Sequence, residues 1–229
     1  MKCQIMEPQR KAIVAPEHIP RPWGQTNYLT MTVRQWLACG SLPRTHAGTR
    51  RPRGDRVSSL AGVDHVLTTE RLVLRPVTSQ DHAVLLAHWT LPDVRRFLFD
   101  GEALAAAGVT KTIEESAQDF NEGGYGIWLI EDGTGLVGTT GLRPLDDLGL
   151  EIFYSLAPGS WGRGYATEAA RAVVEHALGP LGLLEVLAEV DEGNAASVAV
   201  VKRLSMTPYA VVPGVLGPMT RYRTTAGTM

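Results

Sequence analysis

The sequence contains very few cysteines, and both of them, Cys3 and Cys39, lie near the N-terminus. Residues 63–229 therefore hold no thiol that could form a disulfide or act as a nucleophile within that part of the chain. Any chemistry carried by these residues has to proceed without a covalent intermediate on cysteine.

Two other absences narrow the classes of function. No apolar run approaches the roughly 20 residues that a membrane-spanning helix needs, and no apolar core of a secretory signal follows the first charges. The six histidines have no metal-ligand spacing, and neither a His-x-Glu nor a Cys-x-x-Cys pair occurs. We therefore expect no membrane partner, no metal site and a cytoplasmic location.

Acidic residues are scarce in residues 1–62, which hold 10 Lys and Arg but only 3 Asp and Glu. Prolines recur there and apolar periodicity is absent, so we expect a disordered basic N-terminal extension. A transit peptide or an arm that touches nucleic acid fits the same composition. We favour a plain extension, with Met31 as a candidate internal start, and place the folded domain at residues 63–229.

Residues 150–170 are the stretch around which the rest of the chain is organised. An apolar, aromatic strand stops at Pro158-Gly159, a loop with Gly162 and Gly164 follows, and a helix begins near Ala166. The first N–H groups of a helix have no partners within it, and the helix dipole leaves that end partly positive. A glycine loop that leads into a helix therefore favours an anion, most often a phosphate.

Three interpretations of this loop compete with a plain glycine-rich turn. A Walker-type phosphate loop is excluded because no Gly-x-x-x-x-Gly-Lys-Ser/Thr run occurs. A dinucleotide fingerprint fits poorly, because Gly162-Arg-Gly164 lacks the third glycine and the strand ends too early. The third interpretation rests on a resemblance.

The run Trp161-Gly-Arg-Gly-Tyr-Ala166 resembles the acetyl-CoA motif of the Gcn5-related N-acetyltransferases (GNAT), Gln/Arg-x-x-Gly-x-Gly/Ala. Its continuation to Ala169, and the opening Thr69-Glu-Arg-Leu-Val-Leu-Arg75, are similar to the ribosomal-protein (RimJ/RimL-like) branch. The resemblance covers about residues 66–225. It implies an α/β (α+β) fold with a mixed, mostly antiparallel, twisted sheet of about seven strands, helices on both faces, and a splay at the central strands.

Hydrophobic periodicity and turn signals predict elements in a compatible order. The predicted strands are 69–76, 125–130, 136–142, 150–156, 183–190, 209–212 and 219–223. The predicted helices are 79–89, 91–98, 113–120, 166–178 and 195–204, the third of them capped by Thr110.

Glu151 is the candidate general base. It lies in the strand before the loop between apolar neighbours, which would make its carboxylate a better proton acceptor, and its family counterpart is implicated as a base acting through water. An outward-facing charge is the alternative. The resemblance also implies a cofactor-binding set in which backbone groups pair with pantetheine and loop amides hold the pyrophosphate. These residues are Tyr154, Ser155, Leu156, Trp161, Gly162, Arg163, Gly164, Tyr165, Ala166 and Thr167.

The second candidate cluster is Asn194-Ala-Ala-Ser197, an arrangement that recurs in the same branch. The resemblance implies that Asn194 bridges the pantetheine arm and that Ser197 faces the sulfur; an ordinary helix cap is the alternative. Two residues of this helix depart from the pattern of the family. Val201 stands where many members have a tyrosine general acid, which leaves Ser197 or solvent to protonate the thiolate. Ser205 replaces a glycine, so we expect a different helix exit.

The resemblance implies an acetyl-CoA-dependent N-acetyltransferase that acts on a primary amine, such as a protein N-terminus or a small amine. Because residues 63–229 contain no cysteine, transfer would be direct, in a ternary complex. A non-catalytic acyl-CoA sensor on the same fold is the alternative. The expected partners are acetyl-CoA and the amine acceptor; no nucleic acid is expected for the domain, and a homodimer stays open.

Overall fold

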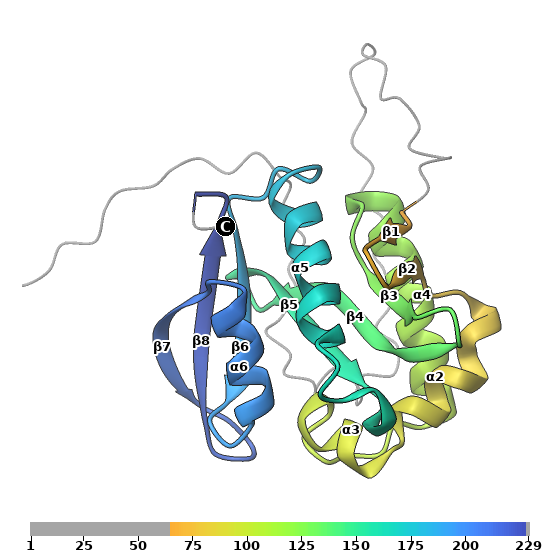
Figure 1. The fold of residues 1–229 in the computed structure, drawn as a ribbon. Helices are drawn as coiled ribbons and strands as arrows, with labels where there is room; N and C mark the ends of the chain where they lie inside the picture. The colour runs from red at the N-terminus through yellow and green to blue at the C-terminus, as the bar shows by residue number, and fades with distance from the viewer. Residues whose placement is uncertain (1–64, 228–229) are drawn as a thin grey trace, which may run out of the picture.

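The computed structural model describes residues 65–227, and the expected extension at residues 1–62 lies outside them. The described strands form one sheet in the order β1-β2-β3-β4-β5-β6-β8-β7 (Figure 1). The strands are β1 (Leu67–Thr68), β2 (Val73–Pro76), β3 (Ile127–Glu131), β4 (Leu136–Leu145), β5 (Gly149–Leu156), β6 (Glu185–Asp191), β7 (Thr207–Pro213) and β8 (Pro218–Thr225). The helices are α2 (His82–Trp89), α3 (Pro92–Leu98), α4 (Ala106–Gly123), α5 (Tyr165–Leu178) and α6 (Ala195–Arg203), with single 3-10 turns at Ser79–Asp81 and Pro158–Ser160.

The centre of the sheet opens between β5 and β6, the one neighbouring pair among the described strands that runs parallel. Their ladder consists of a single residue pair, Glu151 with Leu187. Beyond that pair both strands continue, to Leu156 and to Asp191, without pairing to each other. The predicted fold class, a mostly antiparallel sheet that splays at its centre, is therefore confirmed.

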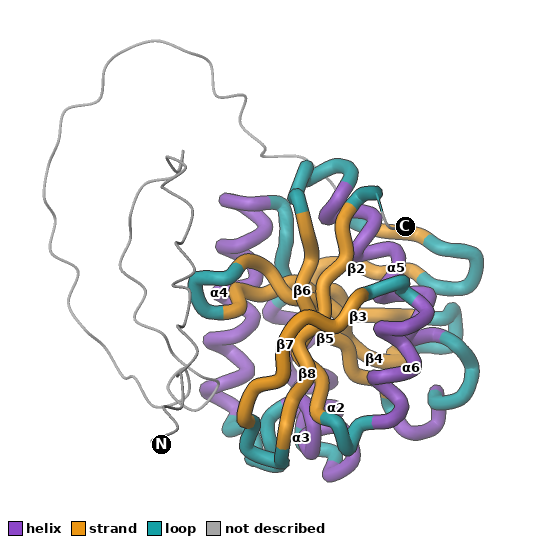
Figure 2. Tube along the Cα trace, turned by 90° about the vertical axis from the view of Figure 1, so that its left-hand side faces the viewer, coloured by secondary structure: helices purple, strands orange, loops and turns teal. Residues whose placement is uncertain are grey.

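Helices cover both faces of the sheet. Because side chains alternate along each strand, neighbouring residues of β3 pack against different helices. On one face Ile127 and Leu129 pack in a cluster with residues of α2 and α4. On the other face Trp128 and Ile130 pack with the buried stripe of α5. Figure 2 shows the strands as a twisted layer, with α4 on one side and α5 and α6 on the other. The helix predicted after the loop, at 166–178, is thus confirmed as α5, with one face buried in the core.

The first predicted strand, 69–76, is shortened to β2, and β1, which was not predicted, precedes it, so the count rises from about seven to eight. Residues 69–72 form a tight turn in which the Thr69 N–H donates to the Leu72 carbonyl at 2.9 Å. The Thr69 hydroxyl also accepts from the Leu72 N–H at 3.0 Å. Residues 69–72, which were predicted as part of a strand, therefore form a turn, and Arg71 lies in that turn.

The third predicted helix begins earlier than expected, at Ala106 instead of Ile113. Thr110 is not its cap, because its hydroxyl donates to the Ala106 carbonyl at 3.3 Å within the helix. Threonine side chains bond to preceding carbonyls in this way in helix interiors. Thr110 is therefore a residue type common at helix N-caps that here lies inside the helix.

The expected change at the end of α6 is also wrong. Ser205 adopts the left-handed conformation, with φ of 57°, that a glycine would supply at this position. The following N–H, of Met206, donates to the Val201 carbonyl at 3.0 Å, as in an ordinary helix termination. Serine takes this conformation at a small energetic cost, so the helix exit is kept.

No helix within residues 65–227 is long and apolar enough to cross a membrane. In the same part of the chain, no group of three or more His, Cys, Asp and Glu side chains is arranged to hold a metal ion.

Candidate active site

A cavity of about 1420 Å³ occupies the splay between β5 and β6. Its wall includes the end of β5, the glycine loop, the first turns of α5 and α6, and residues of α3. Every site residue predicted from the sequence lines this one cavity: Glu151, Tyr154, Ser155, Leu156, Trp161, Gly162, Arg163, Gly164, Tyr165, Ala166, Thr167, Asn194 and Ser197. Residues far apart in the sequence are thus brought together, although their individual roles remain predictions.

The glycine loop presents free backbone donors to the cavity. Gly162 and Gly164 have φ values of 73° and 83°, a region that suits glycine and turns the chain sharply into α5. Among the described residues, none accepts a hydrogen bond from the backbone N–H groups of 162–167. The loop and the helix N-terminus together therefore form a site where an anion fits.

Glu151 is buried at the cavity wall, with 4% of its surface exposed. Its surroundings are not apolar as predicted, because Arg143, its cross-strand neighbour on β4, donates from Nε to Oε1 at 2.7 Å. The Glu189 backbone N–H donates to Oε2 at 3.3 Å. These contacts leave acceptor positions on both oxygens, so the carboxylate can still take a proton through water.

The start of α6 carries the predicted Asn-x-x-Ser pair. The Asn194 side chain accepts from the Ser197 N–H at 3.1 Å, so the cap that the alternative foresaw is present. The Tyr154 hydroxyl donates to the Ser197 carbonyl at 3.3 Å, and burial raises the pKa of Tyr154 to about 12. Val201 is fully buried in the core. Tyr154 therefore brings a phenolic O–H to a region where Val201 offers none.

The Ser155 side chain belongs to a chain of buried polar groups. Its hydroxyl lies 2.9 Å from His88 Nε2 and 2.9 Å from the Thr139 hydroxyl, which accepts from the Trp89 indole N–H. The other ring nitrogen of His88, Nδ1, is buried without a partner among the described residues. Burial lowers the pKa of His88 to about 4, so the ring is neutral at pH 7.

This buried histidine predicts a loss of stability in mild acid. Unfolded, the ring takes up a proton below about pH 6.5, whereas the folded ring resists it until about pH 4. Its contribution to the free energy of unfolding is therefore present above pH 6.5 and is lost as the pH falls toward 4, by on the order of 3 kcal/mol at most. Urea unfolding at several pH values should show a shallower acid slope for His88→Gln than for the parent; parallel slopes would contradict the assignment.

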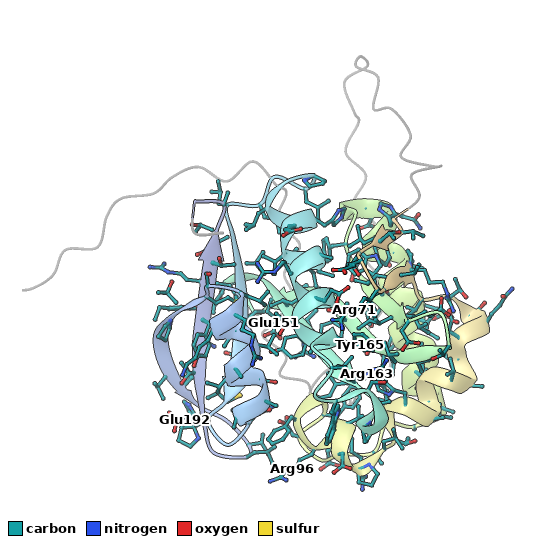
Figure 3. All side chains as sticks on the ribbon, in the orientation of Figure 1. Arg71, Arg96, Glu151, Arg163, Tyr165 and Glu192 are labelled. Atoms are coloured by element: carbon teal, nitrogen blue, oxygen red, sulfur yellow. The ribbon has the colours of Figure 1, made fainter. Side chains whose placement is uncertain are left out.

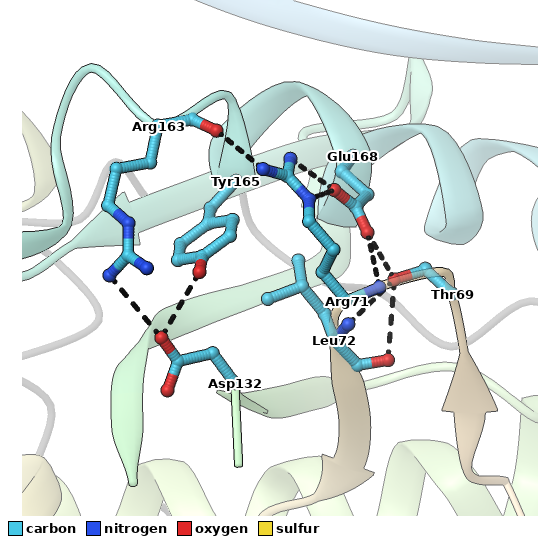
Figure 4. A network of polar contacts seen from close by, with 7 residues as sticks. All are labelled: Thr69, Arg71, Leu72, Asp132, Arg163, Tyr165 and Glu168. Atoms are coloured by element: carbon cyan, nitrogen blue, oxygen red, sulfur yellow. Dashed lines mark hydrogen bonds and ion pairs between the residues drawn. The ribbon is translucent and has the colours of Figure 1, made fainter. Parts of the chain in front are cut away.

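Tyr165, at the first position of α5, lies between two arginines. The guanidinium carbons of Arg71 and Arg163 are 4.8 Å and 4.6 Å from its ring centre. The Tyr165 hydroxyl donates to Asp132 at 3.2 Å, and Arg163 reaches the same carboxylate at 3.4 Å (Figure 4). Figure 3 labels Arg71, Tyr165 and Arg163 close together beside α5. The Arg163 side chain is thus already paired with a carboxylate.

Asp191, at the end of β6, was not identified from the sequence. It lines the cavity with only 8% of its surface exposed, and its Oδ1 has no hydrogen-bond partner in the described part of the chain. Burial, together with the charge of Asp100, raises the pKa of Asp191 above its usual range. A ligand that brings hydrogen-bond donors or positive charge would stabilise a carboxylate that is buried without a partner.

Three comparisons identify relatives of this chain. The sequence model of the family described as "Acetyltransferase (GNAT) domain" matches residues 71–207. A Bacillus licheniformis protein named "Uncharacterized N-acetyltransferase p20" is 27% identical over 145 residues, which cover 61% of this chain and 80% of the relative. The Bacillus subtilis protein "Uncharacterized N-acetyltransferase YoaA" is 33% identical over 138 residues, covering 58% and 77%.

A solved structure shares the architecture. RimL, a ribosomal alpha-N-protein acetyltransferase in complex with coenzyme A, superimposes with a TM-score of 0.63 over 72% of this chain and 99% of its own. Its sequence is 15% identical, so the likeness concerns the fold. With the family match over residues 71–207 and the shared sheet, the chain belongs to the GNAT family of acetyltransferases.

Proposed function

We propose that the protein is an acetyl-CoA-dependent N-acetyltransferase of the RimJ/RimL-like branch that acts on a primary amine. The observation that carries the proposal is the row of free N–H groups at residues 162–167, at the edge of a cavity opened by the splay of β5 and β6. The pyrophosphate of acetyl-CoA fits these donors, because it is an anion that binds backbone amides without needing a particular side chain.

The pantetheine arm would run through the splay. Past the Glu151–Leu187 pair, β5 and β6 have no ladder between them, so their facing edges are available to the amides of the arm. The arm would end near Asn194 and Ser197, which line the same cavity. This arrangement would place the thioester in the cavity that Glu151 also lines.

The acetyl group would move directly from sulfur to nitrogen. The amine must lose a proton before it attacks the thioester carbon, and Glu151 would accept that proton through water. The new C–N bond then forms as the C–S bond breaks. The nitrogen gives its second proton to solvent, and the departing thiolate takes a proton from solvent, either directly or through the Ser197 hydroxyl, which solvent reprotonates. Holding both substrates in one cavity supplies much of the rate.

Acidic residues in the cavity wall support the proposal that the acceptor is an amine. Glu151, Glu189 and Asp191 face the same side of the sheet, and two of them already have arginine partners, Arg143 and Arg221. Asp191 has none among the described residues. An ammonium group of the acceptor would satisfy it.

We therefore expect Asp191→Asn to raise the KM for the amine by about 10- to 100-fold, because a hydrogen bond to a charged group is worth about 1.5–3 kcal/mol. The turnover number and the KM for acetyl-CoA should change little. Glu192→Gln is the matched control, because this neighbour is exposed and lies outside the cavity wall (labelled in Figure 3). An unchanged KM for the amine in Asp191→Asn would remove Asp191 from the acceptor site.

A non-catalytic acyl-CoA sensor is the alternative, and the names of the relatives favour an enzyme. The test is consumption of the acetyl-CoA thioester, measured by thiol release over a panel of amines and short peptides. An N-acetyltransferase gives release that depends on one class of amine. A protein that binds acetyl-CoA tightly but releases no thiol with any amine would be the sensor.

A further inference from the structure

Two sequence motifs that lie almost a hundred residues apart meet at one carboxylate. Glu168, in the first turn of α5, accepts from the Thr69 hydroxyl at 2.6 Å and from the Arg71 backbone N–H at 3.0 Å. The Arg71 guanidinium adds hydrogen bonds from Nε, at 2.8 Å, and from Nη2 (Figure 4). Burial opposes the charge of Glu168, but the hydrogen bonds from Thr69 and Arg71 outweigh it and lower the pKa of the carboxyl.

The same guanidinium also holds the loop itself. Arg71 Nη1 donates to the Arg163 carbonyl oxygen at 3.0 Å (Figure 4). A trans peptide is planar and its C=O and N–H point in opposite directions. With the Arg163 oxygen turned toward Arg71, the Gly164 N–H is therefore turned away from Arg71. One side chain thus sets the direction of a loop amide.

The loop needs such a restraint because of its glycines. Gly162 and Gly164 can adopt many backbone conformations, and fixing them in one conformation costs conformational entropy. A loop that spends only part of its time in the binding conformation binds its ligand more weakly by that fraction. Contacts that fix the loop before the ligand arrives remove this loss.

We infer that Arg71 is a positioning residue for the anion site: by bridging Glu168 and the Arg163 carbonyl, it fixes the backbone amides of 162–167 in the direction of the pyrophosphate. The inference rests on the proposed function, which assigns the pyrophosphate to this loop. It gives the Thr69–Arg75 motif a role in acetyl-CoA binding although Arg71 itself faces α5 and the loop backbone.

The experiment compares two acetyl donors that differ in the pyrophosphate. Acetyl-CoA carries the nucleotide and its pyrophosphate, whereas acetyl-pantetheine carries only the thioester arm. We expect Arg71→Gln to raise the Kd for acetyl-CoA about tenfold or more, measured by calorimetry, and to leave kcat/KM with acetyl-pantetheine unchanged. Arg75→Gln is the matched control, because Arg75 is part of the same motif and pairs with Asp81 at 2.7 Å, away from the loop. It should leave the Kd for acetyl-CoA unchanged.

A second variant separates positioning from simple attraction of charge. Glu168→Ala removes a negative charge near the anion site, so attraction alone would tighten acetyl-CoA binding. Positioning predicts the opposite, because Arg71 loses its main partner and the loop is released. Kd should therefore rise in Glu168→Ala, and the double variant with Arg71→Gln should be no weaker than the weaker single variant. Thermal melting identifies any variant that fails to fold.

The inference is overturned if Glu168→Ala binds acetyl-CoA as tightly as the parent or more tightly, or if Arg71→Gln weakens both donors equally. Failure of the proposed function has a different signature, seen in the parent protein. A parent that does not bind acetyl-CoA, or that uses acetyl-pantetheine as well as acetyl-CoA, removes the pyrophosphate from the loop altogether.

Discussion

Replacing Glu151 by glutamine is expected to lower the turnover number by about 10²- to 10⁴-fold near neutral pH, the usual value of general-base assistance. The affinity for acetyl-CoA should stay nearly intact, because Glu151 lies on β5 away from the loop amides. Glutamine keeps an oxygen that can accept from Arg143, which holds the carboxylate at 2.7 Å in the parent, so the local packing is largely preserved. Steady-state kinetics over a pH series is the measurement.

The pH series provides the control within the same variant. At high pH the amine loses its proton unaided, so the gap between Glu151→Gln and the parent should narrow as the pH rises toward about 9. Ser197→Ala should cost less, because water also protonates a thiolate whose conjugate acid has a pKa of about 8.5. If Glu151→Gln turns over like the parent at every pH, positioning alone carries the rate and Glu151 is not the base.

Gly164→Val is expected to abolish tight binding of acetyl-CoA while the fold survives. Gly164 has a φ of 83°, where a β-branched residue is strained, and a Cβ there would lie 3.4 Å from Arg71 Nη2. Both effects displace the loop amides, and backbone strain of this kind costs about 1–3 kcal/mol, or roughly 5- to 150-fold in affinity. Calorimetry with acetyl-CoA measures the loss.

Gly182→Val is the matched control. Gly182, between α5 and β6, also has positive φ, at 65°, and a Cβ there meets nothing within 4 Å. It therefore carries the same kind of backbone strain without touching the loop, so its melting temperature should fall while its affinity for acetyl-CoA stays at the parent value. Equal affinities for the parent and Gly164→Val would remove the pyrophosphate from this loop.

The local features of the site were predictable because they depend on neighbours in the sequence. The strand that ends before Pro158, the glycine loop and the helix α5 all follow from periodicity and turn chemistry over short windows. The Asn194 cap followed in the same way, from a residue type and its spacing to Ser197. Each of these features involves residues close together along the chain.

The partners of the functional groups were not predictable, because they depend on strand register and on distant turns. Glu151 looked as if it lay among apolar neighbours, and only the pairing of β4 with β5 sets Arg143 opposite it. Arg71 belongs to the predicted strand 69–76, whereas in the structure the turn at 69–72 places it against Glu168 of α5. Asp191 gave no signal, since a carboxylate at the end of a strand commonly lies in solvent.

Two predictions at helix ends were wrong because a residue type common at one kind of position occupies another. Thr110 has the chemistry of a helix cap but lies inside α4, and Ser205 takes a left-handed conformation that glycine takes more readily. In both cases the tertiary structure overrides a weak local preference of about 1 kcal/mol. The first error misplaced the start of α4 and the second concerned only how α6 ends, so neither changes the site.

Mass spectrometry of the products tests the central claim most directly. The full-length protein is incubated with acetyl-CoA and a mixed library of small amines and peptides with free N-termini, and the mixture is compared with one that lacks the protein. We predict that members of one class of primary amine become heavier by one acetyl group, in step with release of coenzyme A. A library that stays unmodified while the protein binds acetyl-CoA would contradict the assignment as an N-acetyltransferase.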